Sequence, residues 1–105
     1  MRAELARASD VEEARAAAIV VTDGDSLAIA LAYDEADPDA VPVVAAVGRA
    51  ERSAAMGEAA RESGVSVLED EPVAVALAVV SLGQPIPEPL YEPIARAMRA
   101  PSPRR

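Results

Sequence analysis

The chain has 105 residues, enough for one domain, and it contains no cysteine, histidine or lysine. Disulfides, thiolate and Schiff-base chemistry, and the commonest general base and transition-metal ligand are therefore excluded, which argues against an enzyme. The formal net charge of −8 argues against nucleic acid as a partner, and no apolar run approaches the roughly 18 residues of a membrane span. We therefore expect a cytoplasmic protein without cofactor, metal or direct membrane insertion.

An N-terminal helical segment is predicted over residues 1–17, where alanine, glutamate, arginine and leucine dominate. The next run, from Ile19 to Val21, is β-branched throughout, as in a buried strand. A first strand is therefore expected over residues 18–22.

A polar tetrapeptide that favours a tight turn comes next and consists of Asp23, Gly24, Asp25 and Ser26. After it, large apolar side chains alternate with alanines from Leu27 to Tyr33. This period of two places the large side chains on one face of a strand. The sequence therefore predicts two strands joined by a sharp polar turn.

Residues 34–40 hold four acidic side chains and a proline, which predicts a solvated loop rather than a metal site. A third strand is predicted over residues 41–47. Pro42 is expected near the start of this strand because it has no amide hydrogen to donate to a sheet, and Gly48 is expected to end it.

A helix is predicted over residues 50–63, with Gly64 as its C-terminal cap, and a fourth strand over residues 65–68. A strand, helix and strand joined this closely form a crossover between parallel strands. The next helix is expected to begin after Asp70, its N-cap, and to run to Val80.

The last helix is predicted over residues 88–99, after a proline-containing extended segment at 84–87. Residues 101–105 are expected to be a disordered tail. Together these elements predict an α/β domain over residues 18–100, with a mixed four-stranded sheet flanked by about four helices.

The segments that carry a family resemblance are spread from residue 18 to residue 98. They include Ile-Val-Val-Thr before the turn, Pro-Val-Val-Ala-Ala-Val-Gly at 42–48 and Ala-Arg-Glu-Ser-Gly-Val-Ser-Val-Leu-Glu-Asp at 60–70. In order and spacing they resemble the cytoplasmic domain of the FlhB/YscU family, the type III export switch proteins of flagella and injectisomes. The resemblance implies a non-enzymatic protein-interaction module of the export apparatus, with export substrates or export-apparatus proteins at the membrane as partners.

Two departures from the family pattern bear on function. Family members carry an N-terminal membrane domain, whereas this sequence begins at Met1 with at most a short helix before the first strand, so it resembles a free-standing copy of the soluble half. Family members also have Asn-Pro-Thr-His at the turn and cleave themselves between Asn and Pro, whereas this chain has Asp23, Gly24, Asp25 and Ser26. The family reaction uses the asparagine amide as nucleophile and the proline nitrogen as leaving group, so the resemblance implies that this degenerate turn does not cleave.

The resemblance also implies a place where partners bind. Val41, Pro42, Ala95 and Met98 align with the apolar patch on which family members dock export substrates. The alternative interpretation is that all four side chains belong to the hydrophobic core.

A different functional hypothesis starts from Asp23 and Asp25. Apolar residues followed by Asp-x-Asp are similar to the nucleophile loop of haloacid-dehalogenase-type phosphatases, in which one aspartate attacks phosphorus and Mg²⁺ neutralises charge. That family also uses a lysine, which this chain lacks, and the chain is short for that fold. A small phosphatase-like or metal-binding enzyme is therefore the alternative to the interaction module.

Overall fold

The structure is a computed structural model that describes residues 10–99. Residues 10–16 are helical. The elements that follow are β1 (Ile19–Thr22), β2 (Leu27–Ala32), β3 (Val43–Arg49), α2 (Glu51–Glu62), β4 (Ser66–Glu69), α3 (Glu71–Ala78), the 3₁₀ turn η1 (Glu88–Leu90) and α4 (Tyr91–Arg99). The predicted helix over 1–17 and tail over 101–105 lie partly or wholly outside the described residues.

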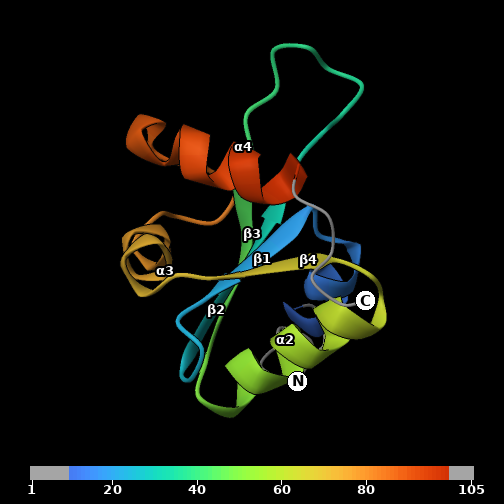
Figure 1. Cartoon of the computed structure of the whole chain (residues 1–105), viewed down its shortest axis with the longest axis vertical. Helices are drawn as coiled ribbons and strands as arrows, with labels where there is room; N and C mark the ends of the chain where they lie inside the picture. Colours follow the sequence, from blue (N-terminus) through green and yellow to red (C-terminus); the bar gives the residue numbers. More distant parts are fainter. Residues whose placement is uncertain (1–9, 100–105) are drawn as a thin grey trace.

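The four strands form one mixed sheet in the order β3-β2-β1-β4 (Figure 1). β1 pairs antiparallel with β2 and parallel with β4, and β2 pairs antiparallel with β3. The predicted α/β class with a mixed four-stranded sheet is therefore confirmed. None of the helices among the described residues is long and apolar enough to cross a membrane.

Helices cover both faces of the sheet, and the two faces use side chains of different size. On the α2 face the buried residues are mostly small: Ala14, Val20, Ala28, Ala30, Ala46, Met56, Ala59 and Ala60. The opposite face is covered by α3 and α4, and the buried residues there are mostly larger: Ile19, Val21, Leu27, Ile29, Leu31, Val44, Val73, Leu77 and Ile94. The predicted alternation along β2 has this cause, because its large side chains face α3 and α4 while its alanines face α2.

The third strand differs from its prediction at both ends. It begins at Val43, one residue after Pro42, and it runs through Gly48 to Arg49. The prediction that Gly48 ends the strand is wrong. A β-carbon at Gly48 would overlap the sulfur of Met56, so the glycine makes room inside the sheet for a fully buried side chain of α2.

β3 also contains a bulge that changes which face its side chains reach. Leu31 of β2 pairs with Val44, but the preceding residue, Ala30, pairs with Ala46. Ala45 is therefore an extra residue between the two pairs. Residues two positions apart share one face of a regular strand. Because of the bulge, Val44 and Ala46 instead belong to the hydrophobic clusters on opposite faces of the sheet.

The C-terminal half follows the predicted order closely. Asp70 is the N-cap of α3, and its Oδ1 accepts a hydrogen bond from the Val73 amide at 3.2 Å. α3 ends at Ala78, two residues before its predicted end at Val80. The extended segment that follows lies along β3, where the Val44 amide donates to the Gln84 carbonyl at 3.0 Å. This segment brings the chain back across the sheet to α4.

Candidate functional site

The side chain of Asp23 makes most of the hydrogen bonds that hold the turn between β1 and β2, and the Thr22 hydroxyl adds one to the Leu27 carbonyl at 2.7 Å. The Asp23 Oδ1 accepts hydrogen bonds from the amides of Asp25 and Ser26, both at 2.8 Å, and of Leu27 at 3.0 Å. Its Oδ2 accepts from the Ser26 hydroxyl at 3.0 Å. Both carboxylate oxygens are therefore engaged by groups that follow Asp23 in the chain.

These hydrogen bonds set the charge state of Asp23. The amide of Asp25, followed by that of Ser26, stabilises the ionised form and lowers the pKa of Asp23 from 3.8 to about 2. The Ser26 hydroxyl and the Leu27 amide act in the same direction. Near neutral pH the side chain is therefore a carboxylate whose oxygens accept hydrogen bonds from the turn.

The next residue, Gly24, has a conformation that suits glycine alone. Its φ is 93°, and a β-carbon there would overlap the carboxylate of Glu69 on the neighbouring strand β4. Its amide donates to the Thr22 hydroxyl at 3.0 Å. Proline has no amide hydrogen and fixes φ near −65°, so this turn is incompatible with an Asp-Pro or Asn-Pro peptide.

Asp23 and Asp25 do not form a metal site with other acidic residues in the structure. Within residues 10–99 no three or more carboxylates come together in a group that could hold a metal ion. Asp25 is exposed, and its amide, rather than its carboxylate, contributes to the turn.

The structure brings Val41, Pro42, Ala95 and Met98 together around one hollow of about 180 Å³. Three further residues line it, and we call the whole set the apolar groove: Tyr33, Ala40, Val41, Pro42, Tyr91, Ala95 and Met98. All four predicted patch residues are partly exposed, while Val41 and Met98 also pack against the core. The groove is therefore an open hollow whose lining includes side chains that also pack against the hydrophobic core.

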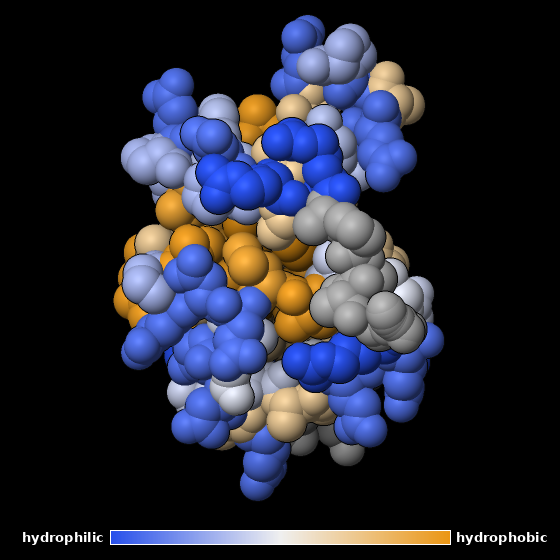
Figure 2. All heavy atoms as spheres, viewed as in Figure 1, coloured by the Kyte–Doolittle hydropathy of each residue, from blue (hydrophilic) through white to orange (hydrophobic). Residues whose placement is uncertain are grey.

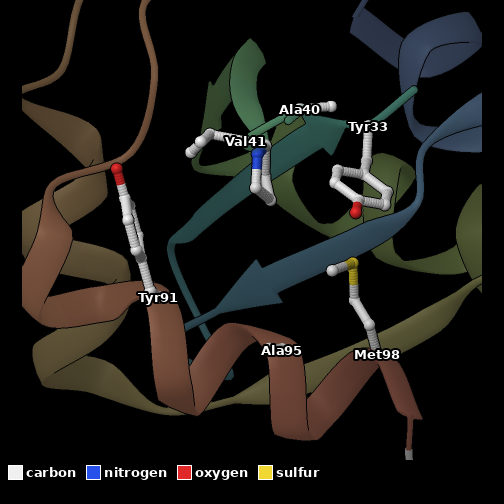
Figure 3. Close-up of a pocket in the computed structure, with 7 residues that line it drawn as sticks. Tyr33, Ala40, Val41, Tyr91, Ala95 and Met98 are labelled. Carbon is white, nitrogen blue, oxygen red and sulfur yellow. The ribbon is translucent and has the colours of Figure 1, made fainter. Parts of the chain in front are cut away.

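Two tyrosines lie at the two ends of the groove (Figure 3). Tyr91 stands at one end, and Tyr33 reaches toward Met98 at the other, with Ala95 on the helix between them. Both tyrosines are exposed, Tyr33 at 37% and Tyr91 at 40%. Sequence reasoning missed them as site residues, although Tyr91, Ala95 and Met98 have the i, i+4, i+7 spacing that places residues on one helix face.

A second apolar surface lies on and just after α3. Val75, Val79 and Leu82 are exposed by 52%, 83% and 64%. Figure 2 shows apolar atoms in this part of the molecule, between the charged surfaces of α4 and α2. Unlike the groove, this surface includes none of the residues that the sequence singled out.

Comparisons with known proteins agree with this architecture. A family model described as the "FlhB HrpN YscU SpaS Family" matches residues 1–100. Three similar crystal structures share 26% sequence identity with this chain. The EscU C-terminal domain with an asparagine-to-aspartate mutation has a TM-score of 0.78, with 94% of this chain and 91% of that chain covered. The same domain with a proline-to-alanine mutation has a TM-score of 0.76, with coverages of 87% and 90%.

The third structure is the cytoplasmic domain of FlhB from Shewanella putrefaciens, with a TM-score of 0.74. The alignment covers 88% of this chain and 70% of that one. No curated protein matches the sequence.

Proposed function

Because the chain belongs to the FlhB HrpN YscU SpaS family and has the fold of a type III export switch cytoplasmic domain, we propose that it is a non-enzymatic interaction module of an export apparatus. The module binds export substrates or export-apparatus proteins on the cytoplasmic side of the membrane, without a cofactor, nucleic acid or membrane insertion of its own. The phosphatase-like alternative based on Asp23 and Asp25 is not supported by the family or by the fold.

The observation that carries this proposal is the apolar groove. Residues of the loop between β2 and β3 and of helix α4, far apart in the sequence, meet there and remain partly exposed, Pro42 and Ala95 among them. A hollow of about 180 Å³ is large enough to hold a single apolar side chain of a protein partner. One buried apolar side chain contributes about 1.5–3 kcal/mol, so we expect weak, transient binding with micromolar or poorer affinity.

Ala95→Asp tests the proposal, because it places a carboxylate at the centre of the groove. Binding of purified export substrates from the source organism, followed by biolayer interferometry, is expected to weaken at least tenfold. Tyr91→Ser provides a second test at an exposed position. The matched control is Ala54→Asp, which makes the same change at an exposed position on α2, on the other face of the sheet.

Circular dichroism and thermal unfolding check that each variant keeps its fold. If folded Ala95→Asp and Tyr91→Ser variants bind as tightly as the unchanged chain, the groove is not the binding site. Weakened binding by Ala54→Asp to the same extent would contradict the proposal as well, since that residue lies outside the groove.

We also infer that this chain does not cleave itself at the turn. Cleavage of the family type needs a side-chain amide nucleophile and a proline leaving group, and the aligned residues here are Asp23 and Gly24. The geometry supports the same conclusion, because both Asp23 carboxylate oxygens are engaged in hydrogen bonds. The Asp23–Gly24 bond is an ordinary secondary amide rather than the tertiary amide of an X-Pro bond, and the sequence has no histidine to assist proton transfer.

A further inference from the structure

The apolar groove continues into a second hollow that carries acidic side chains. This second hollow, which we call the acidic hollow, is lined by Ala32, Tyr33, Asp34, Asp37, Ala40, Val41 and Val43. It shares Tyr33, Ala40 and Val41 with the groove, so the two hollows adjoin along these three residues. A partner seated in the groove would lie directly beside Asp34 and Asp37.

We propose that the groove takes an extended polypeptide segment in which a large apolar side chain is closely followed or preceded by lysine or arginine. The apolar side chain enters the groove, and the cation lies against the acidic hollow. This inference rests on the proposed function and adds the chemistry of the partner.

The loop between β2 and β3 supplies the negative charge. It projects from the end of the sheet beside α4 (Figure 1), and its acidic residues Asp34, Glu35, Asp37 and Asp39 are all exposed. Among residues 10–99, the ion pairs of the structure involve other acidic residues: Asp10, Glu12, Glu62 and Glu92. The four loop carboxylates are therefore not neutralised within the described part of the chain.

Two of these carboxylates also shape the loop. Asp34 Oδ1 accepts a hydrogen bond from the Ala36 amide at 3.0 Å, and Asp37 Oδ1 accepts from the Asp39 amide at 2.9 Å. Such turns place the acidic side chains in defined positions beside Tyr33. Asparagine preserves the accepting oxygen, so the charge can be removed without removing these hydrogen bonds.

A cationic neighbour also fits the charge of the whole chain. The net charge of −8 attracts basic segments and repels acidic ones over distances of about the Debye length, ~10 Å at 0.1 M salt. Because the loop carboxylates are exposed, each contributes modestly, and the preference must weaken as salt increases. Most of the binding free energy therefore comes from the apolar side chain in the groove. The acidic hollow favours partners in which a basic residue lies next to that side chain.

The test uses three synthetic peptides with the same central leucine, flanked on one side by two lysines, two serines or two glutamates. Their affinities for the full chain are measured by fluorescence anisotropy at 0.05 M and 0.5 M salt. At low salt the lysine peptide is expected to bind about three- to tenfold more tightly than the serine peptide, and the glutamate peptide most weakly. At high salt the three affinities are expected to converge.

In the double variant Asp34→Asn with Asp37→Asn, the ratio of the affinities for the lysine and serine peptides is expected to fall at least threefold. The affinity for the serine peptide is expected to stay unchanged. The matched control, Glu51→Gln with Glu58→Gln, removes the same charge from exposed positions on α2 and is expected to keep the preference. Ala95→Asp is expected to abolish binding of all three peptides, because they share the apolar anchor.

The outcomes separate this inference from the proposed function. Equal binding of the three peptides, with binding still lost in Ala95→Asp, would overturn the cationic preference and leave the groove as the binding site. A lysine preference that persists in Ala95→Asn, which adds a polar side chain to the groove without adding a charge, would also overturn it, since the loop would then bind cations without the groove. Peptides that do not bind, while export substrates bind in an Ala95-dependent way, would again overturn only this inference.

Discussion

Replacing Gly48 by alanine is expected to destabilise the protein, although alanine normally stabilises a strand by about 0.5–1 kcal/mol relative to glycine. The added β-carbon would overlap the sulfur of Met56 and lie 3.3 Å from Cγ of Arg52. Met56 is fully buried against the sheet, so it cannot move away freely. Overpacking of this kind costs about 1–3 kcal/mol, which leaves a net loss of up to about 2.5 kcal/mol.

A double-mutant cycle separates overpacking from other effects of the substitution. Met56→Ala alone is expected to cost about 2–5 kcal/mol, and it removes the sulfur that the new β-carbon meets. In that background Gly48→Ala is expected to stabilise the protein, so the effect of the same substitution changes sign. Urea unfolding, with ΔG extrapolated to water, measures all four proteins.

The control for this cycle is Gly57→Ala, in the neighbouring helix α2. A β-carbon there would meet only the flexible end of Arg61, at 3.3 Å. We expect a gain of up to about 1 kcal/mol from helix propensity. Equal destabilisation by Gly48→Ala in the presence and absence of the Met56 side chain would refute the reasoning.

Two further predictions concern the turn. The purified chain is expected to have the mass of one intact polypeptide, and two fragments split after Asp23 in mass spectrometry would contradict the inferred lack of cleavage. Because the pKa of Asp23 is lowered from 3.8 to about 2, its contribution to stability is present above about pH 4 and is lost as the pH falls toward about 2. Asp23→Asn should therefore lose less stability than the unchanged chain over that interval in urea unfolding, and parallel losses would count against the hydrogen-bonded carboxylate.

Much of the fold is readable from local patterns. The alternation from Leu27 to Leu31 predicts two chemically different faces of β2, and the structure places helices on both. Asp70 at the start of α3 follows from the capping preferences of aspartate, because the hydrogen bond involves residues only three apart. Such features depend on neighbours in the sequence and need no knowledge of distant contacts.

Features that depend on distant contacts escaped prediction. The bulge at Ala45 is set by how β3 registers against β2, and no local pattern in β3 reveals it. Gly48 looked like a strand end because the residue that requires it, Met56, lies on another element. Among the residues that line the groove, Pro42 and Ala95 were singled out from the family resemblance. Tyr33 and Ala40 were not, because the path of the loop between β2 and β3 places them beside α4 and the sequence does not specify that path.

The sheet order has a consequence for the route by which this chain folds. β1 is a central strand whose two neighbours reach it at very different times, because β2 follows after a short turn while β4 pairs Ile19 with Ser66. Closing the long loop to β4 costs more chain entropy than closing the hairpin, so we expect the hairpin to form first. During synthesis, one edge of β1 then stays unpaired until residues beyond Glu69 have left the ribosome. We therefore expect the parallel pairing of β1 with β4 to form after the hairpin and to complete the sheet.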